Sequence, residues 1–268
     1  MSAVLSWEAV DRRVLAAVVF TDPLGLPVQS RVSVRALTAG VRLFNKRPGD
    51  VVIAEVPGLS AYTVFDLPAT GLAPALGSIE VVLDVKPADP ALGARRVTVK
   101  LPRDPDSTKP KPSATPVLVP LFAAPAAIPR GLNAAVRVSL HRADDGRAIE
   151  HGLVRLRPDG LPEQYALTDA AGEALFLTAG VPLTSPGAGA TVKPDIGGVV
   201  DAIVDPALAL FHFPGEITSA RAAARTRTSG FVDPADLVAR LSAKATPTVA
   251  VRITSGETST THIDWTTS

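Results

Sequence analysis

Prolines divide this chain into short apolar runs, and their spacing restricts the possible folds more than any other feature. The 268 residues include 25 prolines. Proline has no backbone N–H for a β-ladder and breaks the interior of a helix, so it gathers at turns, strand edges and linkers. Apolar residues make up 46% of the chain and aromatic residues only 4%, so Val, Leu, Ile and Ala must fill the cores. The pattern favours a β-rich fold over a helical one.

The first hundred residues have the alternation of half-buried strands. In SRVSVRAL, Val32, Val34 and Ala36 share one face, while polar side chains share the other. Further strand-like runs, each bounded by Gly, Pro, Asp or Asn, are RRVLAAVVF, VRLFN, VVIAEV, YTVFDL, IEVVLDV and RVTVKL. About seven short strands in about a hundred residues are typical of a β-sandwich. We predict an N-terminal β-sandwich over residues 1–101.

A proline-rich segment follows, from Pro102 to Pro116. It has five prolines, mixed charge and no large apolar residue. This composition favours an extended, semi-rigid linker between two domains, although a proline-rich ligand for another domain has the same composition. We place the domain boundary in residues 102–116 and predict a second domain over residues 117–268.

The second half repeats the strand pattern. AAVRVSLHR directs Val136, Val138 and Leu140 inward, a turn at Asp144-Asp145-Gly146 follows, and LVRLR returns the chain. QYALT and EALFL flank a second turn, DAAG, and VVDAIVDPALALFHF contains one or two strands. VVFTDPLGLPVQSRVSVRAL in the first half can be laid over VSLHRADDGRAIEHGLVRLR, so we interpret the halves as two copies of one sandwich type.

One stretch near the C-terminus predicts a short helix. Asp233 is suited to the N-cap and Pro234 to the first helical position. Leu237, Val238 and Leu241 then fall on one face. After it, TPTVAVRITS and TTHIDW predict a closing hairpin around GETS. The predicted fold is therefore all-β: two tandem antiparallel β-sandwiches, transthyretin-like or Ig-like, with this one helix.

Charge and cysteine content exclude several functions. Lys plus Arg number 27 and Asp plus Glu 26, and a net charge of +1 argues against a protein whose main role is to bind nucleic acid. The basic cluster ARAAARTRT, with Arg221, Arg225 and Arg227, is interpreted as a solvated face, with an anionic contact as the alternative. There is no cysteine, which excludes thiol catalysis, disulfides and Cys-ligated zinc.

The sequence also predicts where the chain is found. Its N-terminus, MSAVLSWEAVDRR, lacks the basic-then-apolar order of a signal peptide. The most apolar long stretch, Pro116–Pro129, contains four prolines and is shorter than a membrane span. We expect a soluble protein without a membrane span that is made in the cytoplasm and joins an assembled particle, with specialised export left open.

A set of residues in the second half resembles a known domain. It comprises Asp144 or Asp145 with Gly146 and Ile149, then Gly152, Val154 and Leu156, then Thr168, Asp169, Gly172 and Phe176. Together they resemble the carboxypeptidase regulatory-like, transthyretin-like β-sandwich domain; the match covers residues 136–176 well and the rest of the second half poorly. The resemblance implies a fold more than a function, because such modules occur in many secreted, surface and assembly proteins. It implies no peptidase activity, since the module lacks the zinc ligands of the peptidase domain.

The first half carries a second resemblance. Val97, Val99, Leu101, Pro102 and Asp104 match a strand ending in V-x-L-P-x-D that leads into a proline-rich linker. This order of parts resembles the first domain of tandem-sandwich proteins encoded with phage-tail-like contractile injection systems. It implies a structural component of an injection particle, such as a baseplate, cap or collar subunit.

The histidines and serines form no recognisable catalytic motif. The four histidines, which lack helical i, i+4 spacing and an HExxH motif, are His141, His151, His212 and His262. His141 and His151 could face each other across a hairpin with Glu150 or Asp144 as a third zinc ligand, but polar residues flanking a turn are the simpler interpretation. Ser60 in GLSAY lacks the second glycine of a nucleophile elbow.

Other candidate sites are equally weak. GAGATV at Gly187 lacks the third glycine of a dinucleotide site. The acidic pairs Asp144–Asp145 and Asp104–Asp106 lie on turns or in the linker and lack the calcium-loop pattern. A carbohydrate-binding module would display aromatic residues on one face, but so few aromatics are more simply used in the core. The aromatic candidates are Trp7, Trp265, Phe211 and Phe213.

These observations predict a protein without catalytic, cofactor-binding or metal-binding residues, and without a cofactor. The function that fits best is a non-enzymatic structural or interaction subunit of a multi-protein particle, most specifically a contractile injection system. Its partners would be other subunits of the assembly, which can include a second copy of itself. We also expect a terminal segment carrying Trp7 or Trp265 to dock on a neighbouring subunit. The alternative is a carbohydrate- or surface-binding β-sandwich module.

Overall fold

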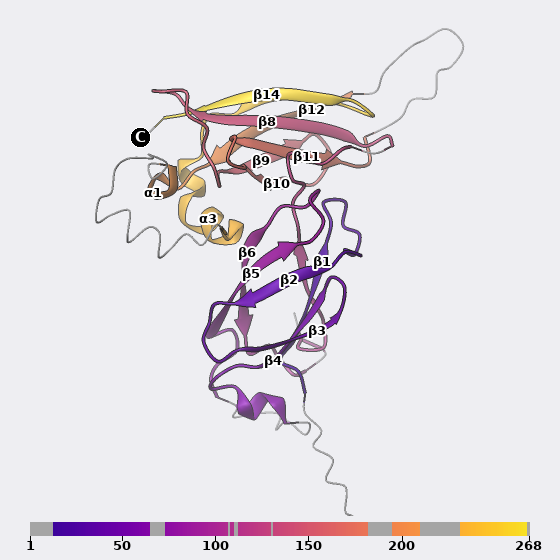
Figure 1. Ribbon diagram of the computed structural model, residues 1–268, viewed down its shortest axis with the longest axis vertical. Helices are drawn as coiled ribbons and strands as arrows, with labels where there is room; N and C mark the ends of the chain where they lie inside the picture. Colours follow the sequence, from indigo (N-terminus) through magenta and orange to yellow (C-terminus); the bar gives the residue numbers. More distant parts are fainter. Residues whose placement is uncertain are drawn as a thin grey trace, which may run out of the picture.

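The computed structural model describes residues 13–64, 73–106, 108–109, 112–129, 131–181, 195–209 and 231–266. The chain is mostly β, with several sheets and a short helix near its C-terminus, so the predicted fold class is confirmed at this level. Figure 1 shows two groups of strands along the long axis, the first half of the chain below and the second half above.

The lower group contains β1 (Ala16–Thr21), β2 (Val32–Ala36), β3 (Arg42–Arg47), β4 (Asp50–Glu55), the 3-10 helix η1 (Ser60–Thr63), β5 (Ile79–Pro87), β6 (Arg95–Leu101) and β7 (Val117–Pro120). One sheet has the order β3-β4-β1-β7 and the other β2-β5-β6. Both sheets contribute to one hydrophobic cluster, which contains Phe20 from β1, Ile53 from β4 and Leu83 from β5, all fully buried. Aliphatic side chains therefore make up most of this core, as the composition requires.

Two strand predictions in this half have different outcomes. The alternation in β2 is confirmed, because Val32 is buried whereas Ser33 and Arg35 are exposed. The strand predicted for YTVFDL is wrong at its start, since Tyr62 and Thr63 lie in η1. The hydroxyl of Thr63 donates to the Ser60 carbonyl at 2.8 Å, a bond that closes a helical turn and competes with a strand ladder.

The proline-rich segment is not an extended linker in its described residues. Asp104 and Pro112 form a β-bridge, and the Ser113 N–H donates to the Asp104 carbonyl at 2.6 Å, so the segment folds back on itself. It leads into β7, which pairs in parallel with β1 and buries Val119 in the first cluster. The sequence assigns residues 117–120 to the second domain, whereas β7 pairs with β1 from the first half of the chain.

The upper group contains β8 (Ala134–Arg142), β9 (Leu153–Pro158), β10 (Gln164–Leu167), β11 (Glu173–Thr178), β12 (Asp195–Ile203), α1 (Pro206–Ala209), α3 (Pro234–Leu241), η2 (Ser242–Lys244), β13 (Val249–Thr254) and β14 (Thr258–Trp265). Its sheets have the orders β10-β9-β12-β13 and β11-β8-β14. They share a second cluster that includes Leu140, Leu156 and Phe176.

The two predictions for the C-terminal region also have different outcomes. Helix α3 is confirmed with its cap, because the Asp233 carboxylate accepts the Ala235 N–H at 3.0 Å and Leu237 is buried. The closing hairpin is wrong, since β13 pairs with β12 while β14 pairs in parallel with β8 in the other sheet. Trp265 at the end of β14 is buried in the second cluster, so its side chain is used in the core of this chain.

The two groups pair their strands in the same way. In each, the last strand lies parallel to the first: β7 beside β1, and β14 beside β8. The other side of each first strand pairs antiparallel, β1 with β4 and β8 with β11. The pairs β2·β5 and β5·β6 correspond to β9·β12 and β12·β13. One strand differs, because β3 pairs with β4 whereas β10 pairs with β9.

The turn after each first strand has the same closing bond. The N–H of Val28 donates to the Phe20 carbonyl, and the N–H of Ile149 donates to the Leu140 carbonyl, each at 3.0 Å. All four side chains are buried. A glycine carbonyl completes each turn. The Gly49 carbonyl accepts the Phe20 N–H at 2.9 Å, and the Gly172 carbonyl accepts the Leu140 N–H at 2.8 Å.

Candidate functional site

The histidines do not come together as the hairpin argument suggests. His141 stacks on His262, with ring centroids 5.0 Å apart, instead of facing His151. His151 lies in the following turn, where its Nε2 is 3.6 Å from Glu150 Oε1. His212 lies outside the described residues. Within the described ranges, no group of three His, Asp or Glu residues is arranged to hold a metal ion.

Ser139, His262 and Asp264 form a hydrogen-bonded chain on the outer surface of β8 and β14. Ser139 Oγ is 3.0 Å from His262 Nδ1, and His262 Nε2 is 2.8 Å from Asp264 Oδ1. These are the residue types of a nucleophilic triad, but the His262 and Asp264 side chains are 50% and 62% exposed. Catalytic triads act in sites that exclude water, so these three hydrogen-bonded residues form a polar network on the protein surface. Sequence reasoning missed it because the parallel pairing of β14 with β8 brings together residues far apart in the chain.

The acidic pairs are occupied by donors from their own turns. Arg142 Nε donates to Asp144 Oδ1 at 3.0 Å, and Arg147 Nε lies 3.3 Å from Asp145 Oδ2. The hydrogen bond from Arg142 lowers the pKa of Asp144. In the proline-rich segment, the backbone N–H and hydroxyl of Thr108 lower the pKa of Asp106. Each of these carboxylates therefore stabilises a turn.

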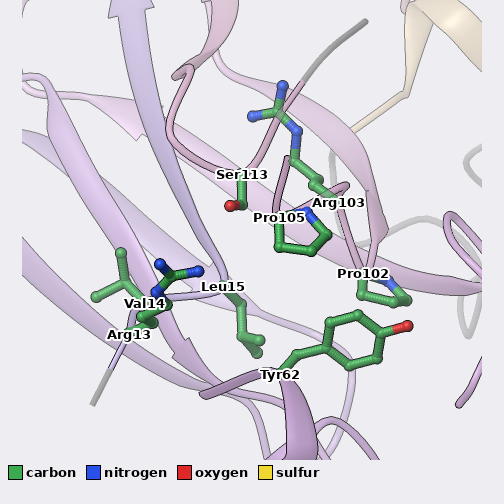
Figure 2. Close-up of a pocket in the computed structure, with 8 residues that line it drawn as sticks. All are labelled: Arg13, Val14, Leu15, Tyr62, Pro102, Arg103, Pro105 and Ser113. Carbon is green, nitrogen blue, oxygen red and sulfur yellow. The ribbon is translucent and has the colours of Figure 1, made fainter. Parts of the chain in front are cut away.

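The region of Ser60 contains a hollow too small for an organic ligand. Its volume is about 10 Å³, enough for one water molecule, and Tyr62 forms part of its wall. In Figure 2 the guanidinium of Arg103 points away from the Tyr62 ring. The Tyr62 hydroxyl donates to the Pro74 carbonyl at 2.8 Å, which fixes the ring in the fold. The remaining lining residues are Arg13, Val14, Leu15, Pro102, Pro105 and Ser113.

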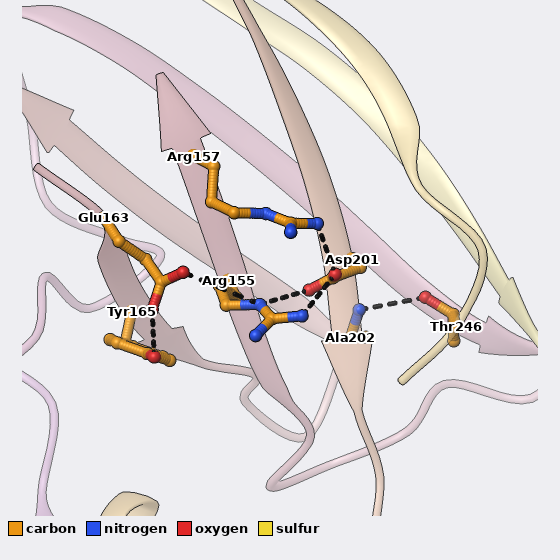
Figure 3. Close-up of polar contacts among 7 residues, drawn as sticks. All are labelled: Arg155, Arg157, Glu163, Tyr165, Asp201, Ala202 and Thr246. Atoms are coloured by element: carbon orange, nitrogen blue, oxygen red, sulfur yellow. Dashed lines mark hydrogen bonds and ion pairs between the residues drawn. The ribbon is translucent and has the colours of Figure 1, made fainter. Parts of the chain in front are cut away.

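A polar network covers part of the outer face of β9, β10 and β12 (Figure 3). Asp201, only 2% exposed, accepts two hydrogen bonds from Arg155, at 2.8 and 2.6 Å, and one from Arg157 at 2.7 Å. The bonds to Asp201 raise the pKa of Arg155. Arg155 Nε is 4.0 Å from Glu163 Oε2, and the Tyr165 hydroxyl donates to Glu163 Oε1. Burial first, and then the bond to Glu163, raise the pKa of Tyr165.

Arg95 lies where the two groups of strands meet. Its Nη1 donates to the Pro120 carbonyl at 2.6 Å, and its guanidinium carbon lies 4.7 Å from the centroid of the Phe122 ring. The side chain comes from β6, is 7% exposed and faces the negative charge of Asp233 at the cap of α3. Burial lowers the pKa of Arg95 to about 10, and Asp233 partly offsets this effect. The guanidinium is therefore still charged at neutral pH.

The connector, which we define as residues 121–129, joins β7 to the turn before β8. Backbone hydrogen bonds of 2.8 Å tie it and the start of α3 to the first half: Gly93 N–H to Phe122 O, Ala124 N–H to Ala91 O, and Arg96 N–H to Val232 O. Phe122 packs with Leu153, Ile203, Val232 and Leu237 in a third hydrophobic cluster. The two halves thus meet through a buried joint.

A cavity of about 180 Å³ opens beside this joint. Its walls come from the turn after β1, from the end of β7 with the connector, and from β10 and β11. The lining residues are Pro23, Pro120, Leu121, Phe122, Ala123, Glu163, Gln164, Tyr165, Leu175, Phe176 and Leu177. No local motif marks Glu163 or Tyr165 in the sequence, because the cavity arises only when the halves are joined.

Several predicted candidates fall outside the described residues: Trp7, Gly187, Phe211, Phe213, Arg221, Arg225 and Arg227. Across the part of the chain that the structure describes, no helix combines the length and apolar character needed to cross a bilayer. Comparisons with protein-family models, with curated proteins and with solved structures found no match to this chain.

Proposed function

We propose that the chain consists of two tandem β-sandwiches of one type, which meet at the connector. The repeated strand pairing and the repeated turn after the first strand support this duplication. The switch of β3 and β10 between opposite sheets is the main difference between the copies. On this proposal the boundary lies in residues 121–133, after β7.

We further propose that the second sandwich is of the carboxypeptidase regulatory-like type. The residues that carry the resemblance have structural tasks. The Thr168 hydroxyl donates to the Ile149 carbonyl at 2.6 Å and accepts the Gly152 N–H at 2.8 Å. Asp169 accepts the backbone N–H groups of the following turn, and Phe176 packs in the core. The motif therefore specifies a fold and leaves function to the surface.

The function we propose is that of a non-enzymatic structural subunit in a multi-protein particle, most specifically a baseplate, cap or collar component of a contractile injection system. The observation that carries a docking role is an apolar row across the outer face of the sheet β3-β4-β1-β7. Phe44 pairs with Val52, which pairs with Ala17; on the same face Val19 pairs with Leu118. Exposed apolar patches of this kind mark interaction surfaces.

The exposure of the row supports this interpretation. Phe44 and Leu118, at its two ends, are 54% and 66% exposed, whereas the alternate residues Val18 and Val51 of the central strands are buried in the core. The outer face of a sheet in water is normally polar. The buried joint adds a second property useful in a particle, because a fixed angle between the sandwiches holds two surfaces in one orientation.

The test is incorporation into a particle. Phe44→Glu and Leu118→Glu should each reduce co-sedimentation of the tagged chain with sheath and tube proteins, while leaving its unfolding curve almost unchanged. The matched control is Leu76→Glu, because Leu76 is 51% exposed but lies outside the row. The assignment to a contractile injection system fails if the wild-type chain does not co-sediment with sheath and tube proteins in cells that assemble such particles.

The alternative function, a carbohydrate- or surface-binding module, has its own outcome. In that case the wild-type chain would bind glycans or cell surfaces in isolation, and the glutamate variants of the row would leave the particle fraction unaffected. A glycan array probed with the wild-type chain distinguishes this function.

A further inference from the structure

The cavity beside the joint has the size of one small ring. Its volume is about 180 Å³. An apolar cavity of about 150 Å³ accommodates benzene, whereas pockets for drug-sized ligands start at about 300 Å³. A single ring with one short substituent fits, and an oligosaccharide does not.

The walls of the cavity are mostly apolar. The connector contributes Leu121 and Phe122, and β11 contributes Leu175 and Leu177. β10 and β11 belong to different sheets, so the cavity lies at the open side of the second sandwich. Apolar walls of this kind favour an aromatic or aliphatic body over a highly hydroxylated one.

One wall is polar and carries a particular charge. Glu163, Gln164 and Tyr165 follow one another along this side. The Tyr165 hydroxyl already donates to Glu163 Oε1. Among the described residues, the nearest cation to Glu163 Oε2 is Arg155, whose Nε is 4.0 Å away, beyond hydrogen-bond distance. The two bonds from Arg155 to Asp201 direct that guanidinium elsewhere. Glu163 Oε2 therefore keeps the capacity to accept a hydrogen bond from an occupant.

We propose that this cavity is a binding site for one ring-sized apolar group that carries a hydrogen-bond donor, either an ammonium or a hydroxyl, which Glu163 accepts. An anionic group is rejected, because it would face the Glu163 carboxylate. The group can belong to a free small molecule or to a side chain of a bound protein. The proposal rests on the cavity alone and does not depend on the proposed role in a particle.

The test compares three probes of the same size: benzylamine, benzyl alcohol and benzoate. Each is titrated into the full chain, and binding is followed by the NMR methyl shifts of Leu175 and Leu177. Benzylamine and benzyl alcohol should saturate these shifts, and benzoate should bind at least about tenfold more weakly, the ratio given by one well-placed polar contact. A peptide, acetyl-Gly-Tyr-Gly-amide, distinguishes the sources: binding of the peptide indicates a protein side chain, and binding of the free probes alone indicates a small molecule.

Variants connect the binding to the cavity. Glu163→Gln keeps an acceptor for Tyr165 but loses the charge, so benzylamine should bind about tenfold more weakly while benzyl alcohol is almost unaffected. Glu55→Gln is the control, because Glu55 is a half-exposed carboxylate on β4, outside the cavity. Leu177→Trp and Gln164→Trp each place a large side chain at a lining position and should each abolish binding. Their unfolding curves are the check that they fold.

The proposal is overturned if no probe gives a saturable shift, if benzoate binds as tightly as benzylamine, or if both tryptophan variants fold and still bind the probes. Binding of D-glucose in preference to benzyl alcohol would also overturn it, because the site would then select hydroxyl groups and not an apolar ring.

Discussion

Gly49 and Gly172 are the residues on which the repeated turn most depends. Both have a left-handed backbone, with φ of 75° and 76°. A Cβ at Gly49 would lie 2.3 Å from the Val28 carbonyl oxygen, and one at Gly172 would lie 2.5 Å from the Leu140 carbonyl oxygen. Neither contact can be relieved by rotating a side chain, because the clashing atom belongs to the backbone.

This geometry predicts a large effect of a single methyl group. Gly49→Ala and Gly172→Ala should each lower the free energy of unfolding by about 2–4 kcal/mol, which combines left-handed strain with a forced backbone shift. Gly25→Ala and Gly146→Ala are matched controls: φ is 82° and 69°, but nothing lies within 4 Å of the added Cβ. In these controls the free energy of unfolding should fall by only about 1–2 kcal/mol. Urea unfolding of the four variants measures the difference, and equal losses would refute the role of the close contact.

At the scale of the element, β14 shows how burial divides along one strand. Ile263 and Trp265 point into the second cluster, whereas His262 and Asp264 face water. Trp265→Ala should therefore lower the free energy of unfolding by about 3–5 kcal/mol, the usual cost of removing a large buried side chain. His262→Ala on the opposite face should cost less than about 0.5 kcal/mol. Thermal unfolding compares the two, and a mild effect of Trp265→Ala would favour the docking interpretation.

The pairing of β7 with β1 changes the expected result of cleaving the proline-rich segment. A protease site inserted after Thr108 should yield two fragments that still elute together, because β7 stays paired with β1 and Val119 stays in the first core. Size-exclusion chromatography in buffer and in denaturant measures this, with the uncut chain as reference. Fragments that separate freely in buffer would show that residues 102–116 act as the linker that the sequence predicts.

Strand pairing is also where sequence reasoning reaches its limit. Alternation in 32–36 and the Asp233–Pro234 signal are local, so β2 and α3 could be predicted from a few neighbouring residues. The partners of β7 and β14 depend on contacts between residues far apart in the chain, which no local pattern contains. The cavity lined by Glu163 could not be predicted from the sequence for the same reason, because its walls come from segments that meet only in the folded chain.

At the scale of the whole molecule, Arg95 is one of the buried residues at the joint between the two halves. Its guanidinium binds the Pro120 carbonyl and stacks on Phe122, while Asp233 balances its charge. A methionine of similar length would keep much of the packing but leave the carbonyl without its donor and Asp233 without the nearby cation. The joint would then lose the interactions that are specific in direction.

Arg95→Met should therefore lower the free energy of unfolding by about 2–4 kcal/mol and widen the distribution of distances between the halves. The chain has no cysteine, so spin labels at Lys46→Cys in the first half and Thr260→Cys in the second report that distribution without background labelling. Arg252→Met is the control for charge, because the Arg252 side chain is 79% exposed and lies on β13, away from the joint. If the distribution is equally narrow in both variants, the apolar contacts of Phe122 with Leu153 and Leu237 hold the halves together without the guanidinium, and the joint is a hydrophobic interface in which Arg95 has no special part.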